Sequence, residues 1–278
     1  MKSRVIFIVL LIVGVAAAVW WYPFQPAEEP AVAERTLFPD PGIPPQPRHP
    51  LPETQPEPSP PAIEGDGEAE SEQEAVPAPE PDPLPELEES DPYLTDLLAG
   101  IVGDEAVTAW LITDRIAERT VVFINSLDDL PVPVELRPIA PVPGEVLVAE
   151  EQGQPYWSGN NFARYQPFIE MMDAVSPAEA ASLYIRNYPL FQEAYAALVP
   201  ETRFFNDRLV EIIDHLSGMP TSSDAEFALE PYEAVYRYAD VNLEEASSGH
   251  KLLMRIGPDN AETALDWLMR FRAEITGG

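Results

Sequence analysis

The hydrophobic positions of the chain begin with an unbroken run of 18 uncharged residues, from 5 to 22. As an α-helix rising about 1.5 Å per residue, this run is about 27 Å long, close to the thickness of the hydrocarbon core of a bilayer. Aromatic residues end the run, as is typical of the interfacial belt of membrane helices. The pattern therefore predicts a single transmembrane helix over residues 5–22.

Basic residues flank only the front of this run. Lys2 and Arg4 precede it, and the next basic residue is Arg35. The positive-inside rule then makes residues 1–4 a cytoplasmic stub of a single-pass inner-membrane protein, with the C-terminal part in the periplasm or otherwise outside the cytoplasm. The alternative is a cleaved signal peptide, because the alanines at 16–18 offer a small-residue cleavage site. Both alternatives export the rest of the chain.

Residues 23–89 have a different composition. Nineteen of these 67 residues are proline, seventeen are Asp or Glu, and only Arg35 and Arg48 are basic. Such a chain cannot bury enough apolar surface to offset its ordering entropy, so we predict a disordered, acidic, proline-rich linker that spaces the following domain from the membrane. The alternative is that its P-x-x-P spacings dock into aromatic-lined grooves. His49 lies in this linker and is not expected to belong to a site.

From residue 90 to residue 278, apolar residues recur at helical spacings of three and four. This pattern predicts one globular, mostly helical domain. Helix starts are expected at or near Ser90, Asp104, Thr113, Phe162, Pro177, Arg203 and Pro258. Pro189 should kink or split its helix, and Gly218 can adopt a left-handed cap conformation at the end of another.

A small β-hairpin element is expected between these helices. Polar and apolar residues alternate with period two at 134–137 and 145–148, and 152–154 resembles a turn. A short strand or extended segment is also expected at 234–238. The fold class is therefore mostly α, with a small β-hairpin, after a transmembrane helix and a linker.

Charge and composition exclude several functions. The 48 acidic and 16 basic residues give a formal net charge of −32, which argues against nucleic acid as a partner and against electrostatic attachment to anionic lipid. Partners recognised through charge should be basic proteins or cations. The absence of cysteine excludes disulfides, thiol catalysis and Cys-based zinc sites. No phosphate loop or dinucleotide fingerprint is present, so we predict no cofactor and no metal.

His215 is the best candidate for chemistry. It lies at the edge of an amphipathic helix whose polar face carries Asp207 and Glu211. A carboxylate–histidine pair could transfer protons or hold a metal, although a solvated helix face is the commoner explanation. The stretch 247–251 combines serines, His250 and the second of the two lysines, but no strained nucleophile turn is visible, and a loop that leads into a buried segment is the expected outcome.

Aromatic residues form a second candidate site. Tyr156, Trp157, Tyr165 and Tyr188 are candidates for an aromatic surface that binds a peptide or a glycan. Their helical spacing makes a place in the core the default expectation.

Four stretches carry a family resemblance: FARYQPF (162–168), YPLFQEAYAAL (188–198), FFNDRLVEIIDHL (204–216) and SSGHKLLMRIGPDNA (247–261). Through them the chain resembles bacterial domain-of-unknown-function family 3014, over roughly residues 86–276. The resemblance implies a bacterial protein, usually with an N-terminal hydrophobic segment. It implies no activity, cofactor or catalytic residue.

Polar residues inside these stretches are candidates for a buried or surface polar network: Asn206, Asp207, Arg208, Asp214, His215, Lys251, Arg255 and Asn260. The first functional hypothesis is a non-enzymatic, membrane-anchored envelope protein that binds another protein at a distance set by the linker. The alternative is an envelope-polymer hydrolase that uses carboxylates with His215. A third is cation buffering by surface carboxylates.

Overall fold

A computed structural model describes residues 46–52, 83–129, 133–199, 203–219, 227–233 and 235–277. The predicted transmembrane helix at 5–22 and most of the predicted linker lie outside these residues. Within the described ranges, no helix is long and apolar enough to cross a membrane.

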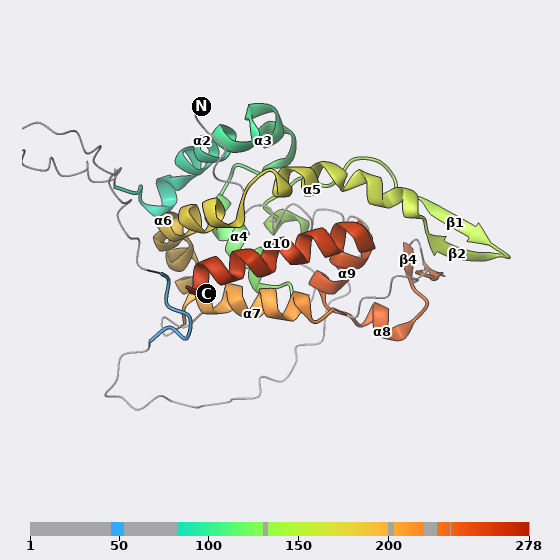
Figure 1. Cartoon of the computed structure of the whole chain (residues 1–278). Helices are drawn as coiled ribbons and strands as arrows, with labels where there is room; N and C mark the ends of the chain where they lie inside the picture. Colours follow the sequence, from blue (N-terminus) through green and yellow to red (C-terminus); the bar gives the residue numbers. More distant parts are fainter. Residues whose placement is uncertain are drawn as a thin grey trace, which may run out of the picture.

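The mostly helical fold class is confirmed. The helices are α2 (Ser90–Val102), α3 (Asp104–Trp110), α4 (Ile116–Asn125), α5 (Gln166–Asp173), α6 (Pro177–Ala196), α7 (Phe205–Ser217), α8 (Val241–Glu244), α9 (Ser248–Ile256) and α10 (Pro258–Thr276), with short 3-10 turns η1 (Leu87–Glu89), η2 (Val134–Leu136) and η3 (Gly159–Arg164). In Figure 1, α10 runs through the middle of the helical body with α7 alongside it. α4, α6, α7 and α10 pack on one another around the main core.

The core follows the expected periodicity. On α7, the apolar residues Phe205, Leu209, Ile212, Ile213 and Leu216 are all buried. On α4, Val121 and Ile124 are fully buried. α6 begins with a capping box, in which Ser176 and Glu179 satisfy each other's backbone N–H groups. The spacing of apolar residues thus decides which face of each helix packs inward.

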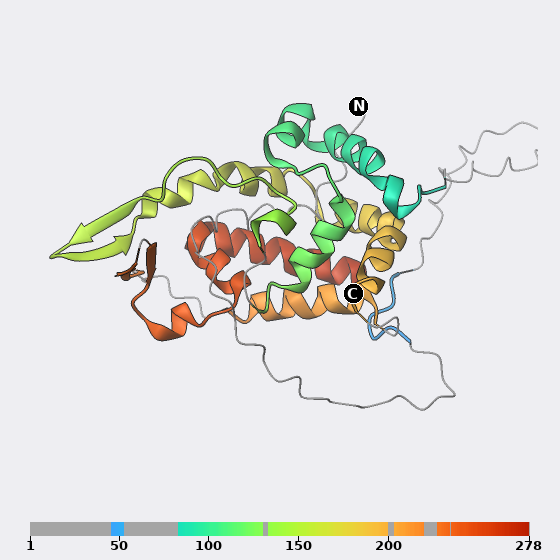
Figure 2. The ribbon, with the colours of Figure 1, turned by 180° about the vertical axis from the view of Figure 1, so that it is seen from behind.

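Two β-hairpins lie at one end of the molecule. β1 (Val148–Glu151) pairs with β2 (Gln154–Trp157), and β3 (Leu229–Tyr232) pairs with β4 (Val235–Tyr238), both antiparallel. Figures 1 and 2 both show β1 and β2 projecting beyond the helices. The turn between them has φ of +53° at Gln152 and +84° at Gly153, which suits a two-residue hairpin loop.

The strand expected at 134–137 is wrong. Residues Val134–Leu136 form the 3-10 turn η2. The guanidinium of Arg119 donates hydrogen bonds to the backbone carbonyls of Glu135 and Arg137. A side chain of α4 therefore satisfies backbone acceptors that a neighbouring strand would otherwise satisfy.

α6 continues through Pro189, so the split that was one of the two expected effects of this proline does not occur. Leu190 and Phe191 beside it are buried in the core, and their packing offsets a cost of about 3 kcal/mol for proline in a helix interior. Gly218 has φ of −79° and is not left-handed; its N–H donates to the carbonyl of His215 at 3.1 Å, which closes α7 with a tight turn instead.

Parts of the predicted linker pack on the domain. Leu84 and Leu87 lie against the main core just before α2, and Leu51 lies against it from much earlier in the chain. The prediction of a disordered linker is therefore wrong for residues 46–52 and 83–89, because their leucines pack on the main core. The remaining linker residues lie outside the described ranges.

Candidate functional site: a segment held on helix α7

The N-terminal turn of α7 carries two polar side chains that are almost fully buried. Asn206 is 1% exposed and Asp207 is 7% exposed. A buried carboxylate needs hydrogen-bond donors, because an ionised group loses its hydration when it leaves water. The donors come from residues 46–52, which we call the docked segment.

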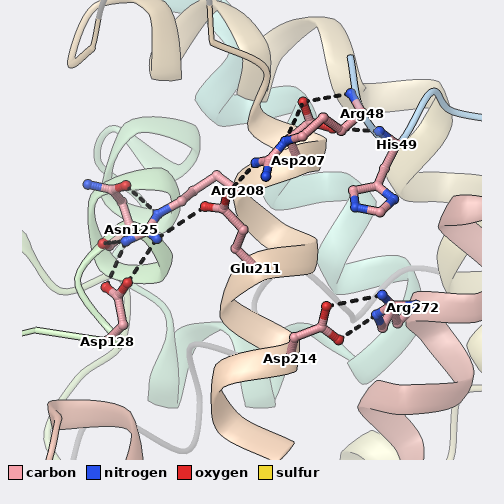
Figure 3. A network of polar contacts seen from close by, with 9 residues as sticks. All are labelled: Arg48, His49, Asn125, Asp128, Asp207, Arg208, Glu211, Asp214 and Arg272. Atoms are coloured by element: carbon pink, nitrogen blue, oxygen red, sulfur yellow. Dashed lines mark hydrogen bonds and ion pairs between the residues drawn. The ribbon is translucent and has the colours of Figure 1, made fainter. Parts of the chain in front are cut away.

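The docked segment is held through its backbone, as Figure 3 shows for Asp207. The carboxylate of Asp207 accepts the backbone N–H of Arg48 at 3.0 Å and that of His49 at 2.7 Å. The side-chain amide of Asn206 donates to the backbone carbonyl of His49 at 2.8 Å. Three hydrogen bonds thus bind the backbone of two consecutive residues, and two of them are strengthened by the charge of the carboxylate.

The Arg48 side chain adds a charged contact. Its guanidinium forms an ion pair with Glu211, one turn further along α7, and lies 3.9 Å from Asp207. The hydrogen bond to Glu211 raises the pKa of Arg48. The Arg48 side chain remains 64% exposed, so solvent screens the ion pair, which contributes only about 0–1 kcal/mol.

Arg208, in the N-terminal turn of α7, contacts the C-terminal end of α4. Its guanidinium donates to both the side-chain and backbone oxygens of Asn125, at 2.8 and 2.7 Å, and to both carboxylate oxygens of Asp128, at 2.9 and 2.7 Å. Burial lowers the pKa of Arg208, but the hydrogen bond and charge of Asp128 outweigh it, and the net pKa is raised. This forked contact fixes α7 against the C-terminus of α4 (Figure 3).

Asp214 joins α7 to α10. Its two carboxylate oxygens accept from the Arg272 guanidinium of α10, at 2.6 and 3.0 Å. Asn206 also reaches α10, donating to the carbonyl of Ile275 at 3.4 Å. α7 is thus joined by polar contacts to the docked segment, to α4 and to α10 (Figure 3).

His215 belongs to a separate histidine pair. Its ring stacks on that of His250, with centroids 4.3 Å apart, and its Nε2 lies 2.8 Å from Ser247 Oγ. His250 Nε2 lies 2.9 Å from the backbone carbonyl of His215. Burial, and then the neighbouring His250, lower the pKa of His215. The fold thus brings together two histidines that are 35 residues apart in the sequence.

The other network candidates lie apart from this site. Lys251 Nζ is 3.5 Å from Glu244, and burial lowers its pKa. Arg255 approaches the buried Tyr238. Asn260 donates to the carbonyl of Ile256 at 2.9 Å, within the junction of α9 and α10. α7 therefore carries Asn206, Asp207, Arg208 and Asp214, together with His215. The other three network candidates, Lys251, Arg255 and Asn260, lie on α9 and at the start of α10.

The aromatic candidates are divided between the main core and the hairpins. Tyr165 is 1% exposed and lies in the main core. Tyr188, on α6, donates its hydroxyl to Gln192 at 2.6 Å, and burial raises its pKa to about 12. Tyr156 and Trp157 lie on β2, where Trp157 packs against the smaller core at the hairpins. Packing, the default expectation, accounts for Tyr165, Tyr188 and Trp157.

Glu211 and His215, the proposed carboxylate–histidine pair, have separate hydrogen-bond partners. Glu211 is directed at Arg48 and Arg208, and His215 is directed at Ser247. Ser247 Oγ also accepts the backbone N–H of His250 and so caps α9. In the part of the chain described here, no three His, Asp or Glu side chains are grouped to hold a metal ion.

Sequence reasoning missed the docked segment and several partners of α7: Arg48, His49, Asn125, Asp128 and Arg272. One signal was available. Arg48 and His49 form the only pair of adjacent potentially basic residues in the acidic, proline-rich stretch, and they are the residues that contact Asp207.

The family described as "Protein of unknown function (DUF3014)" matches residues 116–272, more than half of the chain, and this match contains α4 to α9 and most of α10. No curated protein and no solved structure matches the chain. The docked segment lies outside the matched range.

Proposed function

The chain belongs to this family of proteins of unknown function, and from that premise we propose that it is a non-enzymatic protein-binding module of the bacterial cell envelope. Its N-terminal hydrophobic run anchors it in the inner membrane, and its proline-rich stretch spaces the domain from the bilayer. This proposal joins the sequence argument for export to the contacts made by α7.

One observation carries the proposal: α7 binds a segment from a distant part of the chain through that segment's backbone. Asn206 and Asp207 supply one donor and one bidentate acceptor. Backbone hydrogen bonds with a few side-chain contacts are a recurrent means of peptide recognition. The described polar groups of α7 are engaged with one another or with neighbouring elements, which supports a binding role.

Cross-linking in living cells tests the binding function. A photoreactive residue would replace Arg203 or Ser217, which are exposed and flank the site on α7, in the full chain. Glu150, exposed on the projecting hairpin, is the matched control position. We expect a discrete adduct with a second protein from the α7 positions and none from position 150. Adducts that are absent, or the same from all three positions, would contradict the proposal.

The location is tested separately. A reporter enzyme that is active only outside the cytoplasm, fused after Gly278, should be active when the chain carries residues 1–22 and inactive when they are deleted. Activity of a cytoplasm-specific reporter at the same position would refute the proposed orientation.

A further inference from the structure

We infer that the docked segment is a resident, displaceable ligand of a peptide-binding site on α7. The ligand that replaces it is a short peptide from another protein that bends in the same way, with an arginine between prolines. This inference rests on the proposed function and names the chemistry of the partner.

The backbone contacts define the shape of the ligand. Asp207 accepts the N–H groups of two consecutive residues, and Asn206 donates to the carbonyl of the second. Two consecutive N–H groups can point to one carboxylate only where the backbone bends, and the chain bends at Arg48 and His49. Pro47 and Pro50 flank the contacted residues. Proline has no N–H to leave unsatisfied and favours extended backbone, so it reduces the entropy cost of binding.

Charge defines the central side chain. The site presents Asp207 and Glu211 to Arg48, on a protein with a formal net charge of −32. An acidic side chain at this position would face two carboxylates and be repelled. Arginine matches a carboxylate through a planar fork, so basic peptides are the class that the site selects.

The contacts are weak enough to be exchanged. The charged pair is largely exposed and contributes little, and three backbone hydrogen bonds give only a few kcal/mol. Of the hydrophobic side chains in the docked segment, Leu51 alone packs on the core, and it is only half-buried. The segment stays bound because it belongs to the same chain: residues 53–82 connect it to the domain, and a tether gives an effective concentration on the order of 1 mM.

Competition with this internal ligand sets the expected measurement. If a free peptide binds the open site with a Kd of about 10 µM, an internal competitor at about 1 mM with equal affinity weakens the apparent binding roughly 100-fold. A substitution that releases the docked segment should restore the tighter binding.

Fluorescence anisotropy with a labelled peptide of sequence QPRHPLP, which copies residues 46–52, provides the test on the full chain in detergent. Arg48→Glu places a carboxylate opposite Glu211 and releases the internal segment without altering α7. We expect Arg48→Glu to bind the peptide at least 10-fold more tightly than the unaltered chain. Arg35→Glu makes the same charge change elsewhere in the proline-rich stretch, and should bind like the unaltered chain.

Two further measurements assign the binding to the site. Adding Asp207→Asn to Arg48→Glu should remove binding, and a peptide with Glu in place of its arginine should not bind. Equal binding by the unaltered and Arg48→Glu chains, no binding by Arg48→Glu, or retained binding after Asp207→Asn would each overturn the inference.

The result of the peptide-binding test can be distinguished from the result of the cross-linking test of the proposed function. Peptide binding as expected without a cross-linked protein would leave the site established and the envelope partner refuted. A cross-linked protein at α7 without peptide binding would retain the protein-binding function and reject this ligand class.

Discussion

The carboxylate of Asp207 accepts the backbone N–H of His49 at 2.7 Å, across 158 positions of the chain. The contact joins the first turn of α7 to a stretch whose composition is that of an unstructured linker. Its strength depends on the ionised, nearly buried carboxylate rather than on any apolar surface.

Replacing Asp207 with Asn should release the docked segment. The Asn amide keeps one acceptor oxygen, but its NH2 group is a donor and cannot accept an N–H. At least one of the two backbone hydrogen bonds is therefore lost, at a cost of about 1–3 kcal/mol. The peptide bond between Arg48 and His49 should then be cut by trypsin at least 10-fold faster, as measured by mass spectrometry of timed digests. The bond after Arg35 provides an internal reference whose rate should not change. An unchanged cleavage rate after Arg48 would contradict the docking.

Arg208 should be important for stability because its fork satisfies Asn125 and Asp128 together. Arg208→Ala leaves these acceptors without their donor and should lower the free energy of unfolding by about 2 kcal/mol, as measured by urea denaturation. Arg270→Ala is the matched control. Arg270 pairs with Asp266 on the exposed face of α10, so its loss should change stability by less than about 0.5 kcal/mol. An equal loss of unfolding free energy in the two variants would show that the Arg208 contacts stabilise the domain no more than an exposed ion pair does.

Two helical glycines should respond in opposite directions to the same substitution. A Cβ at Gly249 would lie 2.7 Å from the carbonyl oxygen of Leu127 and 2.4 Å from Leu216 Cδ2, whereas one at Gly100 meets nothing within 4 Å. Gly249→Ala should therefore destabilise by about 2 kcal/mol through overpacking. Gly100→Ala should stabilise by about 0.5–1 kcal/mol, because alanine loses less entropy in a helix. Thermal unfolding of both variants would measure the contrast, and stabilisation by both would mean that α9 does not approach Leu127 closely.

The histidine pair should make stability depend on pH. Burial, with His250, depresses the pKa of folded His215 below its ordinary value of 6.5, so the folded state binds fewer protons than the unfolded chain. The contribution to stability is full above pH 6.5 and is lost as the pH falls towards the folded pKa. Asp128 opposes the shift and Arg208 reinforces it.

Two measurements check this dependence. The His215 ring should titrate in NMR spectra with a midpoint below 6.5, and the fall in Tm between pH 7.5 and 5.5 should be smaller in His215→Gln than in the unaltered chain. A midpoint at or above 6.5, or an equal fall in Tm, would reject the role given to His215.

The helices of the domain were predictable because each depends on local periodicity. The five apolar residues of α7 recur at three- and four-residue intervals and are all buried. β3 was missed because it contains Pro231, which normally counts against a strand and is tolerated at an edge. η2 was taken for a strand because alternation over four residues does not show whether a partner strand exists.

The candidate site was predictable only in part. Asn206, Asp207 and Arg208 were chosen from the right turn of α7, but their partners in the docked segment and at the end of α4 lie 80 or more residues away. Periodicity carries no information on which distant segment satisfies a buried carboxylate. The stacking of His215 on His250 has the same origin, because it depends on how α9 folds back on α7.

The docked segment also changes how far the domain could travel from a membrane. Fully extended at about 3.1 Å per residue, the 67 residues from 23 to 89 would span roughly 200 Å. Because residues 83–89 pack on the domain, the stretch that could extend is residues 23–82, about 190 Å. With residues 46–52 fixed on α7, only residues 23–45 separate the proposed anchor from the domain, a span of about 70 Å at most. Displacement of the segment by a partner would therefore increase the greatest distance between anchor and domain by a factor of about 2.6, so that binding at α7 would change how far the domain extends from the membrane.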